Sequence, residues 1–199
     1  ASLAGVKRFI FLSSVKVNGE ATQYRSPFNE HSKEAPVDNY GISKFEAELG
    51  LSKLGERSGM EICIIRPPLV YGSGVKGNFR YLMRLVSSRL PLPFGSIDNR
   101  RSIVSLDNLV DLIIVCINHK NAANQIFFVS DGADISTSNL IMLIAEARGV
   151  NARLMSVPIP ILLMISQLFK LEPQMQRLTS DLQVDISHVK KQLGWTPKV

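Results

Sequence analysis

The sequence predicts an α/β fold in which helices cover both faces of a parallel sheet. Two apolar runs, "RFIFL" (8–12) and "EICIIR" (61–66), are typical of strands that are buried on both faces. The stretch between them is long enough for a crossover helix, and a strand–helix–strand unit of this kind is parallel and right-handed. With 199 residues, 45% of them hydrophobic, the chain can bury the core of one globular domain.

The crossover helix is expected over residues 39–57. Asp38 precedes it and can cap its first turn, and Gly59 follows its end. Three apolar residues of this helix are expected to pack against the sheet: Phe45, Leu49 and Leu54.

The remaining elements continue the alternation of helices and strands. In chain order we expect a helix at 78–89, a helix at 105–119 capped by Ser105, a strand at 125–130, a helix capped by Ser136 or Ser138 that ends near Gly149, an apolar helix opened by Pro158 and Pro160, and a short last helix before Gly194.

Composition and charge exclude several classes of function. The net charge is +6, but the basic residues are scattered and form no stripe with aromatic residues, so no nucleic-acid partner is predicted. No apolar run reaches the about 18 residues that a membrane span needs. The histidines and cysteines show no metal-ligand spacing: His31, His119, His188, Cys63 and Cys116. Both cysteines lie in apolar runs and no signal peptide is seen, which predicts reduced thiols and a cytoplasmic protein.

A candidate site follows the first predicted strand. Ser13 and Ser14 lie at its carboxyl end, where parallel sheets bind ligands. Tyr40 and Lys44 are four residues apart near the start of the next helix, and therefore on one face. A lysine ammonium beside a tyrosine phenol favours the phenolate, which can take a proton from a sugar hydroxyl while hydride leaves the carbon. The alternative is an aromatic staple with a solvated lysine, and the serines at the strand end favour the site.

Five segments in order resemble the NAD-dependent epimerase/dehydratase family of extended short-chain dehydrogenases/reductases, close to its UDP-glucose 4-epimerases: "FIFLSSVKVNGE", "YGISK", "IIRPPLVYGSG", "NRRSIVSLDNLVDLI" and "LGWTP". They span nearly the whole chain. The resemblance implies the C-terminal part of a Rossmann-like parallel sheet with flanking helices, at about 1–66 and 105–130. It also implies a small mixed α/β substrate-binding lobe, at about 67–104 and 131–199.

The resemblance also assigns roles to individual residues. It implies a catalytic triad of Ser14, Tyr40 and Lys44, an NAD contact at Tyr40, Lys44 and Pro67, and a substrate contact at Ser14, Asn78, Arg101 and Arg177. Pro67 can also simply end a strand, and Arg101 can belong to a solvated pair with Arg100. A guanidinium fork nevertheless suits the phosphate oxygens of a nucleotide diphosphate.

One part of the family pattern is missing from these 199 residues. No Gly-x-x-Gly-x-x-Gly turn occurs, and "GSGVKG" (72–77) lacks its spacing. In the family this turn lies upstream of the serine strand. We therefore expect a chain that is the C-terminal part of a longer protein and that is inactive by itself. The residues that select NAD over NADP would lie in the absent part, so NADP stays open.

The implied function is a nucleotide-sugar 4-epimerase that acts on a UDP-sugar through a transient 4-keto intermediate with NAD. Two alternatives remain at this stage. An NAD(P)-dependent 4-keto nucleotide-sugar reductase would use the same residues, and a non-catalytic nucleotide-binding module could share the fold. The family also implies a homodimer through helices 39–57 and 78–89. The sequence does not indicate which UDP-sugar is bound.

Overall fold

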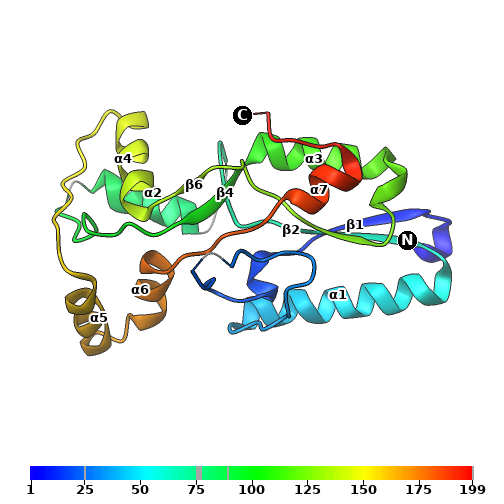
Figure 1. Cartoon of the computed structure of the whole chain (residues 1–199), viewed down its shortest axis with the longest axis horizontal. Coiled ribbons are helices and arrows are strands. Elements are labelled where there is room, and N and C mark those ends of the chain that lie inside the picture. The colour runs from blue at the N-terminus through cyan, green and yellow to red at the C-terminus, as the bar shows by residue number, and fades with distance from the viewer. Residues whose placement is uncertain (25, 75–77, 89, 199) are drawn as a thin grey trace.

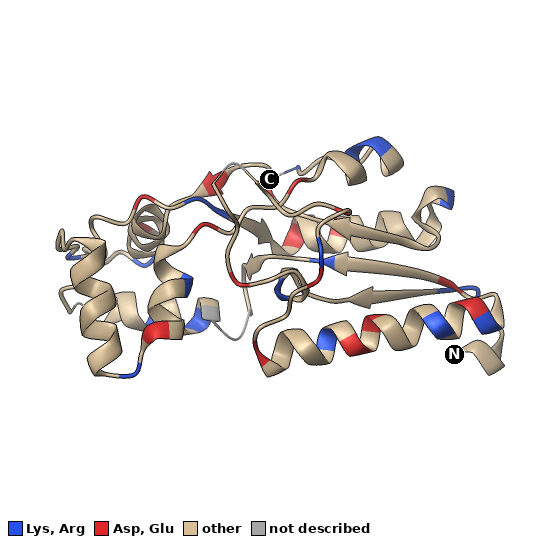
Figure 2. Ribbon diagram, turned by 60° about the horizontal axis from the view of Figure 1, so that its bottom comes forward, with Lys and Arg blue, Asp and Glu red and all other residues tan. Residues whose placement is uncertain are grey.

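The structure is a computed structural model that describes residues 1–24, 26–74, 78–88 and 90–198, with the side chain of Asn78 outside the description. A parallel sheet with its helices occupies one end of the molecule and a lobe of helices occupies the other (Figure 1). Lysines and arginines are distributed over both parts (Figure 2). Within the described ranges, no helix is long and apolar enough to cross a membrane.

The main sheet contains three parallel strands in the order β1 (Arg8–Leu12), β2 (Glu61–Arg66), β5 (Gln125–Phe128). The three predicted strands are confirmed, and the last one is two residues shorter than expected. The central strand β2 is buried from its second residue onward, because helices cover both faces of the sheet. Alternate residues point to opposite faces, so Cys63 and Ile65 enter one core and Ile62 and Ile64 another.

Helix α1 (Asn39–Ser58) lies on one side of the sheet, and α3 (Leu106–Asn118) and α7 (Ser187–Leu193) lie on the other (Figure 1). The predicted helix ends are confirmed by their caps. Asp38 caps α1 and Gly59 ends it in the left-handed conformation, while Ser105 caps α3. Three short 3₁₀ helices complete this part: η1 (Ser2–Ala4), η2 (Val15–Val17) and η3 (Lys120–Ala122).

The prediction of the buried face of α1 is wrong for Leu49 and Leu54, whereas Phe45 is half-buried. Leu49 and Leu54 are 45% and 41% exposed. The side toward the sheet contains instead the carboxylate of Glu48, Leu51, which packs against Ile62 and Ile64, and Gly55. A Cβ on Gly55 would lie 2.8 Å from Ile62 Cγ1, so only glycine permits this close packing. Apolar periodicity alone could not reveal a face on which a glycine and a paired charge lie beside Leu51.

A buried ion pair joins α1 to β2. Glu48 accepts hydrogen bonds from Arg66 Nε at 3.0 Å and Nη2 at 2.5 Å, and their side chains are 4% and 2% exposed. The guanidinium also donates to Asn18 Oδ1 at 3.1 Å and to Glu34 Oε1 at 3.1 Å. Arg66 therefore connects the central strand, the first long helix and the loop after β1.

In the part of the lobe that the structure describes, there are a small mixed sheet and four helices. Strand β4 (Arg101–Ser105) pairs in parallel with β3 (Leu69–Tyr71) and antiparallel with β6 (Asp134–Ile135). The helices are α2 (Asn78–Ser87), α4 (Thr137–Ala147), α5 (Ile159–Leu168) and α6 (Glu172–Thr179). Apolar residues of α2, α4 and α5 share a second core. Ser136 caps α4 and Pro158 precedes α5, as expected. The α/β class with a parallel sheet and a mixed lobe is confirmed.

The C-terminal segment packs with the main sheet. Leu182, Val189 and Trp195 belong to the same core as β2 and β5. The indole Nε1 of Trp195 donates to Asp111 Oδ2 in α3 at 2.7 Å. The sequence-based division assigns residues 131–199 to the lobe. From Leu182 onward, however, buried apolar residues of this segment pack in the core of the main sheet. Cys63 and Cys116 are free and buried, which confirms the interpretation of both as buried thiols.

Candidate functional site

The predicted site begins where β1 ends. The Ser13 N–H donates to Ile65 O at 2.8 Å, and the Val15 N–H donates to Pro67 O at 3.0 Å. The loop after β1 therefore stays attached to the end of β2. The Ser14 hydroxyl caps η2 by accepting a hydrogen bond from Lys16 N at 3.3 Å. This cap leaves the hydroxyl proton of Ser14 available to another acceptor.

Ser13 shows a signal of its own. Its side chain is buried, and its hydroxyl has no hydrogen-bond partner among the described residues. A buried hydroxyl without a partner is costly, and nearly all such groups in proteins are paired with protein or water. At the carboxyl end of a parallel strand, an orphaned hydroxyl indicates a place where a ligand or an ordered water completes the site.

Tyr40 and Lys44 lie beside the same strand end. Lys44 Nζ donates to the carbonyl of Leu12, the last residue of β1, at 2.9 Å. It also lies 5.8 Å from the centroid of the Tyr40 ring, within the range of a cation–π contact. Tyr40 is 51% exposed, so its phenol is accessible. The fold thus gathers Ser14, Tyr40 and Lys44 around one strand end, although no described hydrogen bond joins the Ser14 hydroxyl to the Tyr40 phenol.

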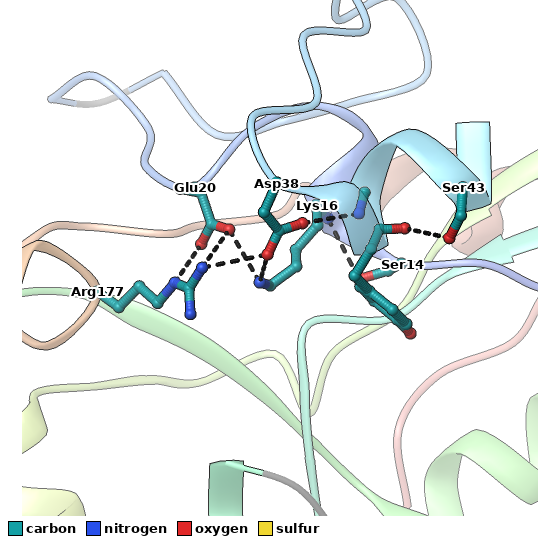
Figure 3. A network of polar contacts seen from close by, with 8 residues as sticks. Ser14, Lys16, Glu20, Asp38, Ser43 and Arg177 are labelled. Atoms are coloured by element: carbon teal, nitrogen blue, oxygen red, sulfur yellow. Dashed lines mark hydrogen bonds and ion pairs between the residues drawn. The ribbon is translucent and has the colours of Figure 1, made fainter. Parts of the chain in front are cut away.

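Four charged side chains form a network next to these residues (Figure 3). Lys16 Nζ contacts Asp38 Oδ2 at 2.5 Å and Glu20 Oε1 at 2.9 Å. Arg177, on α6 of the lobe, donates from Nε to Glu20 Oε2 at 3.1 Å and from Nη2 to Asp38 Oδ2 at 3.1 Å. Each carboxylate is therefore bound by both cations.

The first turn of α1 is anchored to this network. Asp38 Oδ1 accepts the Gly41 N–H at 2.7 Å, which is the N-cap of the helix. A Cβ on Gly41 would lie 2.8 Å from the carbonyl oxygen of Lys16, so the helix start touches the loop after β1 directly. Tyr40 lies between the capping residue and this close contact.

The other predicted residues are dispersed around the lobe. Arg101 begins β4, and its Nη1 donates to Ser180 O at 2.9 Å. Burial lowers the pKa of Arg101 to about 10, which still leaves a cation at neutral pH. Arg177 forms ion pairs with two carboxylates of the network, and its side chain is only partly exposed to solvent. Asn78 begins α2, and its side chain lies outside the described residues.

A second tyrosine, Tyr71 on β3, is not suited to act as a base. Burial and the neighbouring Asp131 carboxylate raise the pKa of Tyr71 to about 12. Its phenol therefore stays protonated at neutral pH, and it is no competitor for the role assigned to Tyr40.

Sequence reasoning missed Lys16 and Glu20. Their spacing of four residues is a weak local signal for an ion pair. The contact of Glu20 with Arg177 spans 157 positions in the chain, and no local pattern could predict it. Asp38 was predicted only as a helix cap, and the structure adds its two ion pairs.

The charge of Asp38 predicts a dependence of stability on pH. Burial alone would raise the pKa of Asp38, but the hydrogen bonds from Lys16 and the Gly41 N–H outweigh it and hold the pKa below its ordinary value of 3.8. A carboxyl whose folded pKa is lowered stabilises the fold above its unfolded pKa, and this stabilisation is lost as the pH falls through the folded pKa. Asp38→Asn keeps an oxygen for the cap but removes the charge.

We expect the difference in free energy of unfolding between wild type and Asp38→Asn to be constant above about pH 5 and to shrink as the pH falls toward about 2. Urea unfolding of both proteins over this range measures it. A difference that stays the same at all these pH values would contradict the assignment of the charge network.

Comparison with known proteins gives a consistent result. Residues 1–130 match the model of the NAD dependent epimerase/dehydratase family. A UDP-glucose 4-epimerase of Vibrio cholerae is 54% identical over 195 residues, which is 98% of this chain and 60% of the relative. The chain thus spans about three fifths of the length of this relative.

Solved structures with this fold include two other epimerases. The UDP-glucuronic acid 4-epimerase of Bacillus cereus, in complex with NAD, superposes with a TM-score of 0.76 at 18% identity, covering 100% of this chain and 58% of the other. The UDP-glucose 4-epimerase of Thermotoga maritima, with UDP-glucose, gives a TM-score of 0.74 at 22% identity, covering 100% of this chain and 60% of the other. At these identities the likeness establishes the fold.

Proposed function

The chain belongs to the NAD-dependent epimerase/dehydratase family, and on that premise we propose that it is the sugar-acting part of a nucleotide-sugar 4-epimerase. The observation that carries the proposal is the gathering of Ser14, Tyr40 and Lys44 at the carboxyl end of β1. The Vibrio cholerae relative supports a UDP-sugar as the substrate class.

In the proposed reaction the Tyr40 phenolate accepts the proton of the sugar O4 hydroxyl. The Lys44 ammonium lies 5.8 Å from the centroid of the Tyr40 ring, and the Ser14 hydroxyl hydrogen-bonds the same sugar oxygen. When bound, NAD supplies the acceptor and later the donor of the hydride at C4. The 4-keto sugar would turn over within the site, so that hydride would return to the opposite face of C4 while Tyr40 returns the proton to O4.

The residues at this strand end suit the nicotinamide end of NAD. The hydroxyl of Ser13, the residue after Leu12, is a buried polar group without a hydrogen-bond partner among the described residues. We propose that Tyr40 and Lys44 hold the nicotinamide ribose and that the segment at Pro67 borders the ring. Bacillus cereus UDP-glucuronic acid 4-epimerase is known in complex with NAD, which supports the choice of cofactor.

We assign the diphosphate of the substrate to Asn78 and Arg101. Arg101 remains a cation at neutral pH and lies at the start of β4. A guanidinium donates two parallel hydrogen bonds to phosphate oxygens. Arg177 could add a third contact only through the guanidinium atom Nη1, because Nε and Nη2 bind Glu20 and Asp38.

The natural protein that contains this chain should interconvert UDP-glucose and UDP-galactose, or a related pair, with catalytic NAD and no added reductant. Nuclear magnetic resonance of the sugar H1 signals measures the ratio of the two isomers. A strict requirement for NADPH and a keto sugar would identify a reductase instead. Binding of UDP-sugar without any turnover would identify a non-catalytic nucleotide-binding module.

We further propose a homodimer through α1. Ile42 and Leu49 are seven residues apart, lie on one face of the helix and are both exposed. The second helix of the predicted interface, α2, lies in the lobe, away from α1 (Figure 1). We therefore expect Leu49→Glu to shift the protein from dimer to monomer in sedimentation at micromolar concentration. A wild type that is monomeric at these concentrations would contradict the proposal.

For the 199-residue chain by itself we expect no measurable NAD affinity and no turnover. The pyrophosphate of a dinucleotide binds a glycine-rich turn at a helix N-terminus, and these residues contain no such turn. Weak UDP binding through Asn78 and Arg101 should remain. Calorimetry with NAD, and separately with UDP, tests both expectations. Micromolar NAD binding would show that the cofactor site is misplaced.

A further inference from the structure

The network of Lys16, Glu20, Asp38 and Arg177 joins three segments that are far apart in the chain. Lys16 and Glu20 belong to the loop after β1, Asp38 caps α1, and Arg177 lies on α6 of the lobe (Figure 3). The four side chains are between 19% and 33% exposed. Partly shielded charges that act as a network interact more strongly than an isolated surface pair.

The contacts form a closed ring. Lys16 binds Glu20 and Asp38, and Arg177 binds the same two carboxylates. Two cations and two carboxylates leave no net charge. Removal of any one member leaves both opposite charges with the same single partner, so the four side chains hold their positions as a unit.

Two members of this ring of charges, Asp38 and Lys16, contact groups next to Tyr40 or Tyr40 itself. Asp38 fixes the first turn of α1 through the Gly41 N–H at 2.7 Å. Lys16 Nζ lies 5.9 Å from the centroid of the Tyr40 ring, almost the same distance as Lys44 Nζ at 5.8 Å. The ring of Tyr40 thus lies near two ammonium groups, and the position of one of them depends on Glu20 and Asp38.

We infer that these four residues are positioning residues that couple helix α6 of the lobe to the first turn of α1 and so orient Tyr40 for catalysis. Arg177 is the member that the lobe contributes. The inference rests on the proposed function of Tyr40. It assigns Arg177 a role different from that of a direct diphosphate ligand, because two of its three guanidinium nitrogens donate to carboxylates.

The two roles of Arg177 predict different kinetics. With Arg177→Gln in the natural protein, we expect kcat to fall about tenfold while KM for the UDP-sugar changes less than about threefold, because orientation of the base is lost and substrate contacts remain. Arg153→Gln is the matched control, since Arg153 is an exposed arginine of the same lobe. An increase of about tenfold in KM at unchanged kcat would overturn the inference and identify a diphosphate ligand.

A double variant tests whether the residues act as a unit. Glu20→Gln and Arg177→Gln together should lower kcat no further than the more severe single variant, since either change already opens the ring. Effects that multiply would show that the two residues act independently and would overturn the inference.

A third measurement does not depend on turnover. Hydrogen exchange of the Gly41 amide, followed by mass spectrometry of the α1 N-terminal peptide, should accelerate at least about threefold in Arg177→Gln and stay unchanged in Arg153→Gln. Equal exchange in both variants would overturn the coupling. If the wild type converts no UDP-sugar but Arg177→Gln still shows this acceleration, the proposed function is refuted and the coupling of lobe and helix remains supported.

Discussion

Tyr40→Phe is expected to lower the turnover of UDP-sugar by about two to four orders of magnitude, the range that a positioned acid–base group contributes. The variant keeps the aromatic ring near Lys16 and Lys44 but loses the hydroxyl that carries the proton. Binding of the UDP-sugar should stay within about threefold, because the proposed diphosphate contacts come from the lobe. Turnover follows from the isomer ratio, and binding from calorimetry.

The matched control for this prediction is Tyr81→Phe. Tyr81 is an exposed tyrosine on α2, so the same hydroxyl is removed from a position outside the site. This control should retain wild-type turnover. Turnover of Tyr40→Phe within about threefold of wild type would refute the catalytic assignment of Tyr40, and an equal loss of UDP-sugar affinity would indicate a binding role instead.

Glu48→Gln should have the largest effect on stability. It leaves the guanidinium of Arg66 buried in the middle of the fold, with the carboxylate of Glu34 as its remaining charged partner. Breaking one side of a buried pair costs about 3–5 kcal/mol, because the other charge stays desolvated. Urea unfolding should show this as a lower midpoint at an unchanged slope.

Two further variants separate the buried charge from other causes. Glu46→Gln changes an exposed carboxylate on the same helix and should alter the free energy of unfolding by less than about 0.5 kcal/mol. The double variant Glu48→Leu with Arg66→Met removes both charges and should be more stable than Glu48→Gln. A loss below about 1 kcal/mol for Glu48→Gln would mean that the pair is solvated.

Local patterns in the sequence determined the elements of this fold. Continuous apolar runs predicted β1 and β2, and the capping residues Asp38 and Ser105 predicted where α1 and α3 begin, with Ser136 or Ser138 predicted to cap α4. These signals involve only a few neighbouring residues, so they can be interpreted without knowledge of the packing. The spacing of Tyr40 and Lys44 likewise placed both on one face of a helix.

Only the tertiary structure decided how these elements meet. It placed Gly55 and Glu48 of α1 toward the sheet, because Arg66 on β2 supplies a buried partner and Gly55 permits close approach. It also brought Arg177 to Glu20, across 157 residues, when the lobe folded back against the loop after β1. Contacts of this kind depend on the packing of whole segments, and the identity of a single residue carries no signal for them.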